Sequence, residues 1–321
     1  MLKKNNLWVF PLFAGLIFFC SQSFALKFQL PPKGDDLFGE VQFGQVFEGD
    51  DFAKIARRYD VGFFELVEAN PEVNPDQPVP GTVVIVPREY LLPHVPRKGI
   101  IINLATMRLY YFPKNKNYFY TYPIGIGRRN WMSPLGALHI IQKIKNPVWV
   151  VPDSIMKYRR EHGDPVPKVA QSGPMNPLGY YALRLSKPTY LIHGTNEPSS
   201  VGRRSSAGCI HLYPEDVKQL FGMVSKGEPV LVINQPYVAG TMNHKLYIEA
   251  HLPLVEEREA LSNTSVVVVA LINSLLESDQ GSQIDWQKAD EIVREHMGIP
   301  TQVGEVQPPL QQAQNRKKPE A

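Results

Sequence analysis

Residues 100–112 read IIINLATMRLYYF, two apolar runs of strand length separated by a short turn. Dense β-branched and aromatic side chains are typical of strands. Further runs of this kind occupy residues 119–126, 135–141, 180–185, 190–193 and 229–234. One helix is predicted over 214–223, because Glu215 and Asp216 fall in its first turn. Residues 99–234 are therefore predicted to form a mainly β domain, either a sheet sandwich or a partly closed barrel.

The first 25 residues have the pattern of a secretory signal: Lys3 and Lys4, an apolar run over 7–19, and the small-residue pattern Ser23-Phe24-Ala25. We expect cleavage there, although a retained N-terminal anchor stays open as an alternative. The apolar run is shorter than the about 20 residues that a membrane span needs. Removing the two lysines lowers the formal net charge from +3 to +1, so charge indicates no partner class. We expect no nucleic-acid partner.

Residues 41–87 are predicted to form a separate small unit with the order strand, helix, helix, strand. Asp51 is placed to cap a helix over 52–59, and a second helix over 63–69 ends at Asn70-Pro71. The flanking strands are expected near 42–47 and 81–86.

This βααβ unit resembles a lysin motif (LysM). The matching features are Glu48-Gly49-Asp50, residues 55–59, Asn70-Pro71, Pro80-Gly81 and Ile85-Val86-Pro87. The resemblance implies a module that binds the N-acetylglucosamine-containing glycan of peptidoglycan or chitin. Such a module raises the local substrate concentration and contributes no chemistry. A packing domain without a ligand is the alternative.

The chain after Asn234 carries weaker signals. A strand over 245–254 and amphipathic helices over 265–276 and 285–297 predict an α/β extension across residues 235–304. The tail over 305–321 has Pro308-Pro309 and no apolar periodicity, and we expect it to be disordered.

Cys209 is the one cysteine of the predicted mature chain, because Cys20 lies in the signal. An unpaired thiol sent to an oxidising compartment favours a nucleophile over a structural disulfide. A free thiol titrates at about 8.5, so an imidazole must take its proton or stabilise the thiolate. His193 ends a predicted strand and is the candidate acid/base, and the carbonyl of Gly194 can hold its other ring nitrogen.

The residues just before Cys209 complete the candidate site. Gly208 permits a tight turn in which the N–H groups of Ala207, Gly208 and Cys209 converge on an oxyanion. Arg204 and Ser206 are candidates to orient this loop or to bind a substrate carboxylate, and a loop-bracing Arg204 is an equal alternative. The eight histidines lack the spacing of metal ligands, and no phosphate-binding glycine loop occurs. We expect no metal and no cofactor.

These residues resemble the L,D-transpeptidase catalytic domain of the YkuD type. The signature comprises His193-Gly194-Thr195-Asn196, Arg204, Ser206, Gly208, Cys209 and Leu212. Similar segments fall at 123–127, 133–136, 146–149 and 176–179. The resemblance covers about residues 100–234, and the order of LysM, catalytic domain and extension is similar to a periplasmic group of Gram-negative bacteria.

The resemblance implies a nucleophile at Cys209, an acid/base at His193 and an orienting carbonyl at Gly194, with Asn196 near the substrate. It implies attack on the third residue of a peptidoglycan tetrapeptide stem, loss of the terminal D-alanine, and a thioester. The acceptor is then a diaminopimelate amine, giving a 3-3 crosslink, or a lysine of an outer-membrane lipoprotein. Water as acceptor would make the protein an L,D-carboxypeptidase.

Two positions depart from the family pattern. His211 stands where the family usually has Arg, and Ala207 where many members have His. An imidazole is largely neutral near pH 7, so a carboxylate clamp at position 211 is in doubt. One hypothesis gives His211 the role of a titratable cation that contacts substrate, and the other has it packed beside Leu212 under the loop.

Two other classes of protein are alternatives. A wall-binding protein with a degenerate catalytic domain would leave Cys209 an ordinary, slow-reacting thiol. A papain-like peptidase is disfavoured, because its cysteine precedes its histidine in the chain and here the order is reversed.

Overall fold

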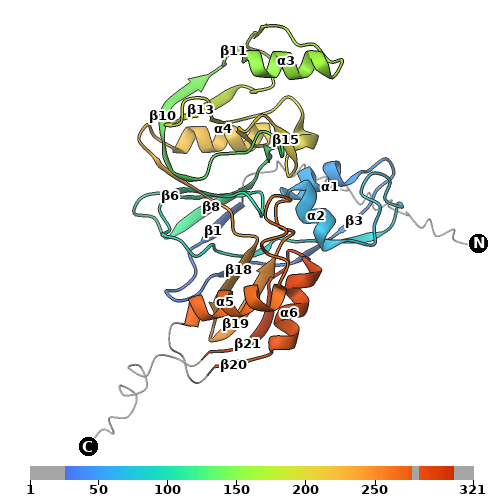
Figure 1. Cartoon of the computed structure of the whole chain (residues 1–321), viewed down its shortest axis with the longest axis vertical. Coiled ribbons are helices and arrows are strands. Elements are labelled where there is room, and N and C mark those ends of the chain that lie inside the picture. The colour runs from blue at the N-terminus through green and yellow to red at the C-terminus, as the bar shows by residue number, and fades with distance from the viewer. Residues whose placement is uncertain (1–25, 277–281, 307–321) are drawn as a thin grey trace, which may run out of the picture.

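The computed structural model describes residues 26–276 and 282–306. The predicted export signal lies outside these residues, as does nearly all of the predicted tail. Glu305 belongs to a strand, so the tail prediction was wrong at that residue. The catalytic domain is uppermost in Figure 1, the LysM unit lies to one side, and the C-terminal extension lies below. Over 26–276 and 282–306, no helix is long and apolar enough to cross a membrane.

The largest sheet of the described residues has nine strands, and the mainly β prediction is confirmed (Figure 1). Their order across the sheet is β1 (Leu26–Gln29), β8 (Tyr118–Pro123), β7 (Arg108–Phe112), β6 (Gly99–Asn103), β17 (Pro229–Ile233), β10 (Gly136–Lys145), β13 (Tyr181–Leu185), β14 (Leu191–His193) and β16 (Ile210–His211). The pairs β6–β17 and β14–β16 are parallel and the other pairs are antiparallel. Strand β1 precedes the LysM unit and still pairs with β8.

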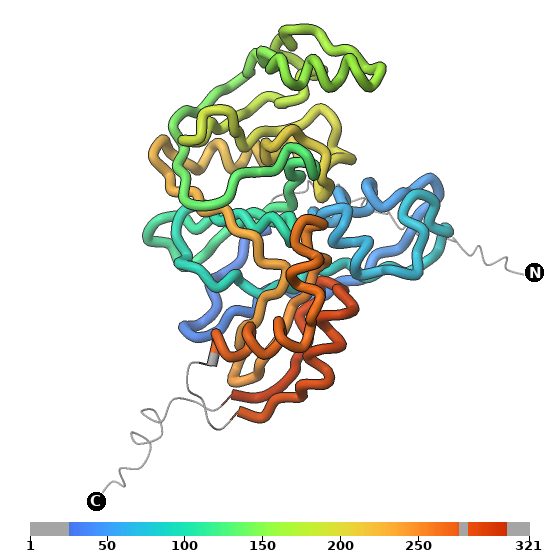
Figure 2. The backbone as a smooth tube through the Cα atoms, in the orientation of Figure 1, coloured from blue at the N-terminus to red at the C-terminus, as the bar shows by residue number. Residues whose placement is uncertain are grey.

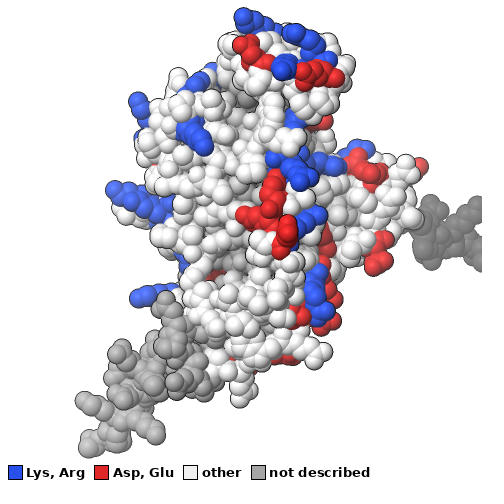
Figure 3. Space-filling model, in the orientation of Figure 1, with Lys and Arg blue, Asp and Glu red and all other residues white. Residues whose placement is uncertain are grey.

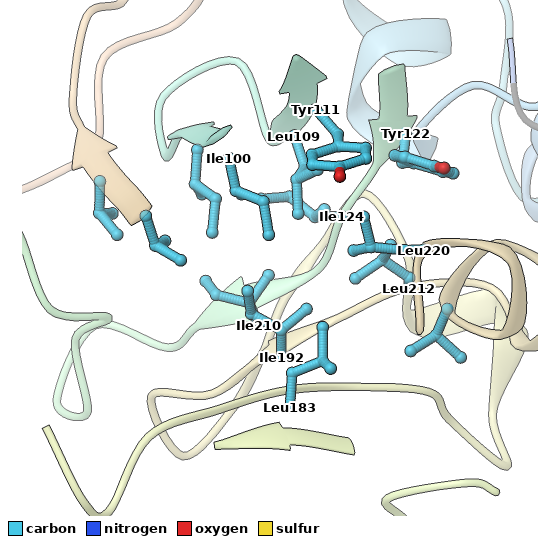
Figure 4. Packing of buried hydrophobic residues seen from close by; sticks show 14 of the residues in the cluster. Ile100, Leu109, Tyr111, Tyr122, Ile124, Leu183, Ile192, Ile210, Leu212 and Leu220 are labelled. Carbon is cyan, nitrogen blue, oxygen red and sulfur yellow. The ribbon is translucent and has the colours of Figure 1, made fainter. Parts of the chain in front are cut away.

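The sheet curls back on itself and buries apolar side chains inside the curl. Figure 4 shows Ile100 and Leu109, from β6 and β7, facing Ile192 and Ile210 across the interior. The helix α4 (Pro214–Met223) closes this core with Leu220. The outer face is also covered: Ile101 packs with residues of the chain on either side of the LysM unit. Burial on both faces explains why β6 is a continuous apolar run.

Short elements occupy the connections of the catalytic domain. They are β9 (Ile126–Gly127), β11 (Trp149–Val150), α3 (Asp153–Glu161), β12 (Val169–Ala170), the 3-10 turn η1 (Pro198–Ser200) and β15 (Arg204–Ser206). Strands β11 and β12 pair with each other and, with α3 between them, form a flap over residues 149–170 at one end of the molecule (Figure 1). Both basic and acidic side chains lie on the surface at this end (Figure 3).

The LysM unit has the predicted βααβ order. It consists of β3 (Gln42–Gln45), α1 (Phe52–Tyr59), α2 (Phe63–Ala69) and β4 (Val83–Val86), with β3 and β4 antiparallel. Asp51 caps α1 as predicted, because its side chain accepts a hydrogen bond of 2.8 Å from the N–H of Lys54. Strands β2 (Leu37–Gly39) and β5 (Glu89–Leu91) pair at the two ends of this unit and connect it to the rest of the chain.

The C-terminal extension is an α/β layer. Its sheet has the order β18 (Tyr237–Met242), β19 (Lys245–Ala250), β21 (Thr301–Glu305) and β20 (Gln283–Ile284). Helices α5 (Thr264–Leu276) and α6 (Trp286–Glu295) pack on it through a shared apolar cluster. The predicted strand and both predicted helices are present.

Buried ionic contacts join the three parts. Arg108 of β7 donates to both oxygens of Glu65 on α2, at 2.7 and 2.6 Å, and both side chains are almost fully buried. His251 lies between Glu68 of α2 and Glu249 of β19, at 2.7 and 2.8 Å. Burial lowers the pKa of His251, but the two glutamates outweigh it and raise that pKa to about 10. The LysM unit is therefore fixed to both neighbours, as the adjoining tubes of Figure 2 show.

Candidate active site

The parallel pairing of β14 with β16 brings the predicted catalytic residues together. His193 pairs with His211, and Ile192 pairs with Ile210, so Cys209 lies just before β16 beside the start of β14. Side chains two residues apart on a strand share a face. Cys209 and His193 therefore point to the same side of the two strands, and both line one cavity of about 820 Å³.

His193 has the orientation that a general base requires. Its Nδ1 lies 2.5 Å from the carbonyl oxygen of Gly194, the partner predicted from the sequence. Because that carbonyl can only accept, Nδ1 carries the proton and Nε2 keeps a free lone pair. Burial, together with the neighbouring ring of His211 at a centroid distance of 6.0 Å, lowers the pKa of His193 to about 3. The imidazole is neutral at neutral pH and can accept a proton.

The thiol of Cys209 is a protonated group in this environment. Burial raises the pKa of Cys209, and a backbone hydrogen bond from Leu191 partly opposes that effect. The Sγ atom also lies 3.8 Å from the carbonyl oxygen of Thr189, which can accept the thiol proton. A neutral thiol and a neutral imidazole thus form the resting pair, and the thiolate forms only as the proton is transferred.

The loop before Cys209 is held by Ser206. The Ser206 hydroxyl donates to the carbonyl oxygen of Cys209 at 2.6 Å and accepts from the N–H of Gly208 at 3.1 Å. The Gly208 N–H is thus engaged inside the loop, which corrects the expectation that it points at an oxyanion along with those of Ala207 and Cys209. Gly208 has φ +105°, and a Cβ there would lie 2.8 Å from the ring of Tyr190, so the turn requires glycine.

Arg204 braces the loop, which favours that one of the two alternatives that the sequence left open. Its guanidinium forms two hydrogen bonds of 2.8 Å to Glu256 of the C-terminal extension, and its Nε donates to the carbonyl of Gly127 at 3.1 Å. Asn196 does line the active-site cavity, and its amide donates to the carbonyl of Met175 at 3.3 Å.

His211 is packed and neutral. Its Nε2 lies 2.9 Å from Oγ and 3.2 Å from the carbonyl oxygen of Ser200. Since that hydroxyl donates a hydrogen bond of 2.6 Å to the backbone carbonyl oxygen of Glu197, the imidazole must be the donor to Ser200. Burial lowers the pKa of His211 to about 4. This geometry favours the hypothesis of a packed His211 over that of a cation that titrates between about pH 6 and 8.

The cavity also contains residues that sequence reasoning did not assign. Arg128 and Trp131 come from the loop after β9, and Trp149 and Arg159 come from the flap. The guanidinium of Arg128 lies 4.9 Å from the ring centroid of Tyr158 on α3, which links this loop to the flap. The segment 146–149, which includes Trp149, resembles the family, but nothing in the sequence placed the flap beside Cys209.

Comparison with known proteins agrees with this geometry. Residues 97–232 match the L,D-transpeptidase catalytic domain (YkuD), and residues 45–87 match the LysM domain. The chain is 36% identical to the probable L,D-transpeptidase YcfS of Escherichia coli K12, covering 91% of this chain and 92% of that protein. This chain belongs to the L,D-transpeptidase family.

Two further relatives support the assignment. The probable L,D-transpeptidase YbiS of Escherichia coli K12 is 34% identical over 93% of this chain and 99% of its own. The putative L,D-transpeptidase YkuD of Bacillus subtilis is 30% identical over 59% of this chain and 96% of its own. The YcfS and YbiS alignments extend beyond the catalytic domain, so the sequence similarity to those two relatives covers most of this L,D-transpeptidase.

Proposed function

We propose that this L,D-transpeptidase acts in the periplasm on tetrapeptide stems of peptidoglycan through a thioester on Cys209. The observation that carries the proposal is the placement of the Cys209 thiol and the neutral, Gly194-oriented His193 on one face of an open cavity. A cavity of about 820 Å³ can accept an extended peptide stem.

In the first half-reaction the thiol proton passes to Nε2 of His193 as Sγ bonds to the carbonyl carbon of the third stem residue. The amides of Ala207 and Cys209 are the proposed donors to the resulting oxyanion, since the Gly208 amide is bonded to Ser206. The tetrahedral species collapses as His193 protonates the leaving amine. Free D-alanine departs, and an acyl thioester remains on Cys209.

In the second half-reaction an amine attacks the thioester, and the thiol is regenerated. The acceptor is either the diaminopimelate side chain of a neighbouring stem or a lipoprotein lysine, with water giving the carboxypeptidase reaction. The LysM module, by the family it matches, is proposed to bind the glycan of the same wall. Export by the N-terminal signal would place all of these groups in one compartment.

Two variants test the proposal. Cys209→Ser should lose transfer of soluble tetrapeptide stems while keeping the wild-type circular dichroism spectrum, because a hydroxyl is far less acidic than a thiol. A carbapenem-type β-lactam should add one mass equivalent to the wild type and none to Cys209→Ala. Transfer by Cys209→Ser above a few per cent of the wild-type rate, or an adduct on Cys209→Ala, would refute the nucleophile assignment.

A further inference from the structure

The LysM module contacts the segment of chain that carries the catalytic cysteine. We call residues 198–216 the catalytic segment, since it contains Cys209 and His211. In the first turn of α2, the N–H of Phe63 donates to the carbonyl of Val201 at 3.4 Å and the N–H of Phe64 donates to that of Gly202 at 3.2 Å. First-turn amides have no acceptor within their own helix, so the catalytic segment supplies the acceptors here.

The LysM module also contacts the catalytic segment downstream of Cys209. The buried hydroxyl of Tyr213 donates to the carbonyl of Val61 at 3.1 Å. Arg57 forms two hydrogen bonds of 3.1 Å to Glu215, at the first turn of α4. Residues 57–64 therefore contact the catalytic segment on both sides of the nucleophile, seven residues before it and four after it.

This contact leaves no free space between the two backbones. Gly202 has φ +76°, and a Cβ at that position would lie 2.1 Å from the backbone nitrogen of Phe63 and 2.5 Å from Cα of Gly62. A Cβ on Gly62 would in turn lie 3.1 Å from Cα of Gly202. The guanidinium of Arg203 lies 3.3 Å from the centre of the Phe63 ring. A displacement of α2 must therefore displace the catalytic segment with it.

A short chain of contacts connects this junction to the reacting pair. Ser200, two residues before Gly202, accepts from Nε2 of His211. The ring of His211 stacks beside that of His193. The carbonyl of Arg203 accepts from the N–H of Ile126 at 3.0 Å, which ties the same stretch to the wall of the sheet.

We propose that the LysM module positions the catalytic segment, with Gly62 and Phe63 as positioning residues for His211 and, through it, for His193. The module thus contributes to the chemical step even when the substrate has no glycan. This replaces the expectation that the module supplies only local concentration. The inference rests on the proposed roles of Cys209 and His193.

The test uses the full-length protein and a soluble tetrapeptide donor without glycan. Gly202→Ala places a methyl group against α2. Gly227→Ala is the matched control, because Gly227 also has a positive φ, +88°, while its Cβ would meet nothing within 4 Å. Gly62→Ala applies a milder contact from the LysM side. Rates are normalised to active sites titrated by carbapenem acylation, so that loss of folded protein is not counted as loss of chemistry.

We expect Gly202→Ala to lower kcat/KM per titrated site about tenfold or more and to shift the pH dependence of kcat/KM. Gly62→Ala should change kcat/KM and its pH dependence in the same direction as Gly202→Ala, but to a smaller extent. Gly227→Ala should match the wild type. Should Gly202→Ala not fold, Gly62→Ala and Tyr213→Phe give the same readouts. The proposal would be overturned if Gly62→Ala and Gly202→Ala both kept the kcat/KM and the pH dependence of the wild type. If Gly202→Ala does not fold, the same result in Gly62→Ala and Tyr213→Phe would overturn it. Failure of the proposed function would appear differently, as an inactive wild type or an active Cys209→Ala.

Discussion

Two buried carboxyl groups at the junction between the LysM module and the catalytic domain predict an unusual pH dependence of stability. Asp60, at the end of α1, and Asp216, in the first turn of α4, are both almost fully buried. Burial raises the pKa of Asp60 to about 6, although Arg108, Asp216 and Arg88 oppose it and Glu65 adds to it. Burial also raises the pKa of Asp216 well above its ordinary value, reinforced by the charges of Asp60 and Glu215.

The sign follows from proton binding. The folded protein holds protons on these groups that the unfolded chain releases above about pH 4, so their contribution to stability is greatest at low pH and falls as pH rises. For Asp60 the loss of stability extends from pH 3.8, its ordinary pKa, to about pH 6. Asp216 extends this loss of stability to higher pH. At about 1.4 kcal/mol for each pKa unit, the Asp60 shift corresponds to a loss of about 3 kcal/mol by neutral pH.

The perturbation is Asp216→Asn, which removes one charge and leaves an amide that can donate to Asp60. We expect this variant to equal the wild type near pH 4 and to become steadily more stable than the wild type as pH rises to 8, because burial raises the pKa of the carboxyl that it removes. Thermal denaturation from pH 4 to 8 should show a Tm advantage of this variant that grows as pH rises. Asp153→Asn is the control, since Asp153 also lies in the first turn of a helix but is exposed. An Asp216→Asn advantage that is absent, or constant with pH, would refute the reasoning.

Three further outcomes are expected. Glu65→Ala leaves the guanidinium of Arg108 buried without its partner, so urea denaturation should show a free energy of unfolding lower by about 3–5 kcal/mol. A loss below about 1 kcal/mol would mean that water reaches Arg108. His211→Arg should lower the Tm and leave the pH dependence of kcat/KM unchanged between pH 6 and 8, because the ring packs against Gly125 and is neutral in the wild type; a flattened profile would restore the charge hypothesis. Asn176→Ala should lower the Tm by removing the amide that holds Pro147 and Leu178 at 2.8 and 2.9 Å, and an unchanged Tm would show that the flap base is held otherwise.

The strands of the catalytic domain were predictable because their composition is decided locally. The run at 100–112 is buried on both faces and is therefore apolar at most positions. The LysM order was predictable for a related reason, since Asp51 and Asn70 mark helix ends by hydrogen bonds within a few residues.

Features that depend on distant partners could not be predicted. Helix α3 buries no side chain among the residues described, so its sequence carries little apolar periodicity. Arg204 became a loop brace only because Glu256 reaches it from the C-terminal extension. The packed position of His211 depends on Gly125 and Ser200, which the fold brings to it from different connections.

The Cys209 thioester is the central claim, and intact-protein mass spectrometry tests it most directly. The wild type is mixed with a soluble tetrapeptide stem in the absence of an amine acceptor, and the reaction is quenched in acid within one turnover. The account predicts a mass increase equal to the mass of the tetrapeptide stem minus that of one free D-alanine, located on the Cys209 peptide and removed by hydroxylamine. Release of D-alanine without any such species, or the same increase on Cys209→Ala, would contradict it.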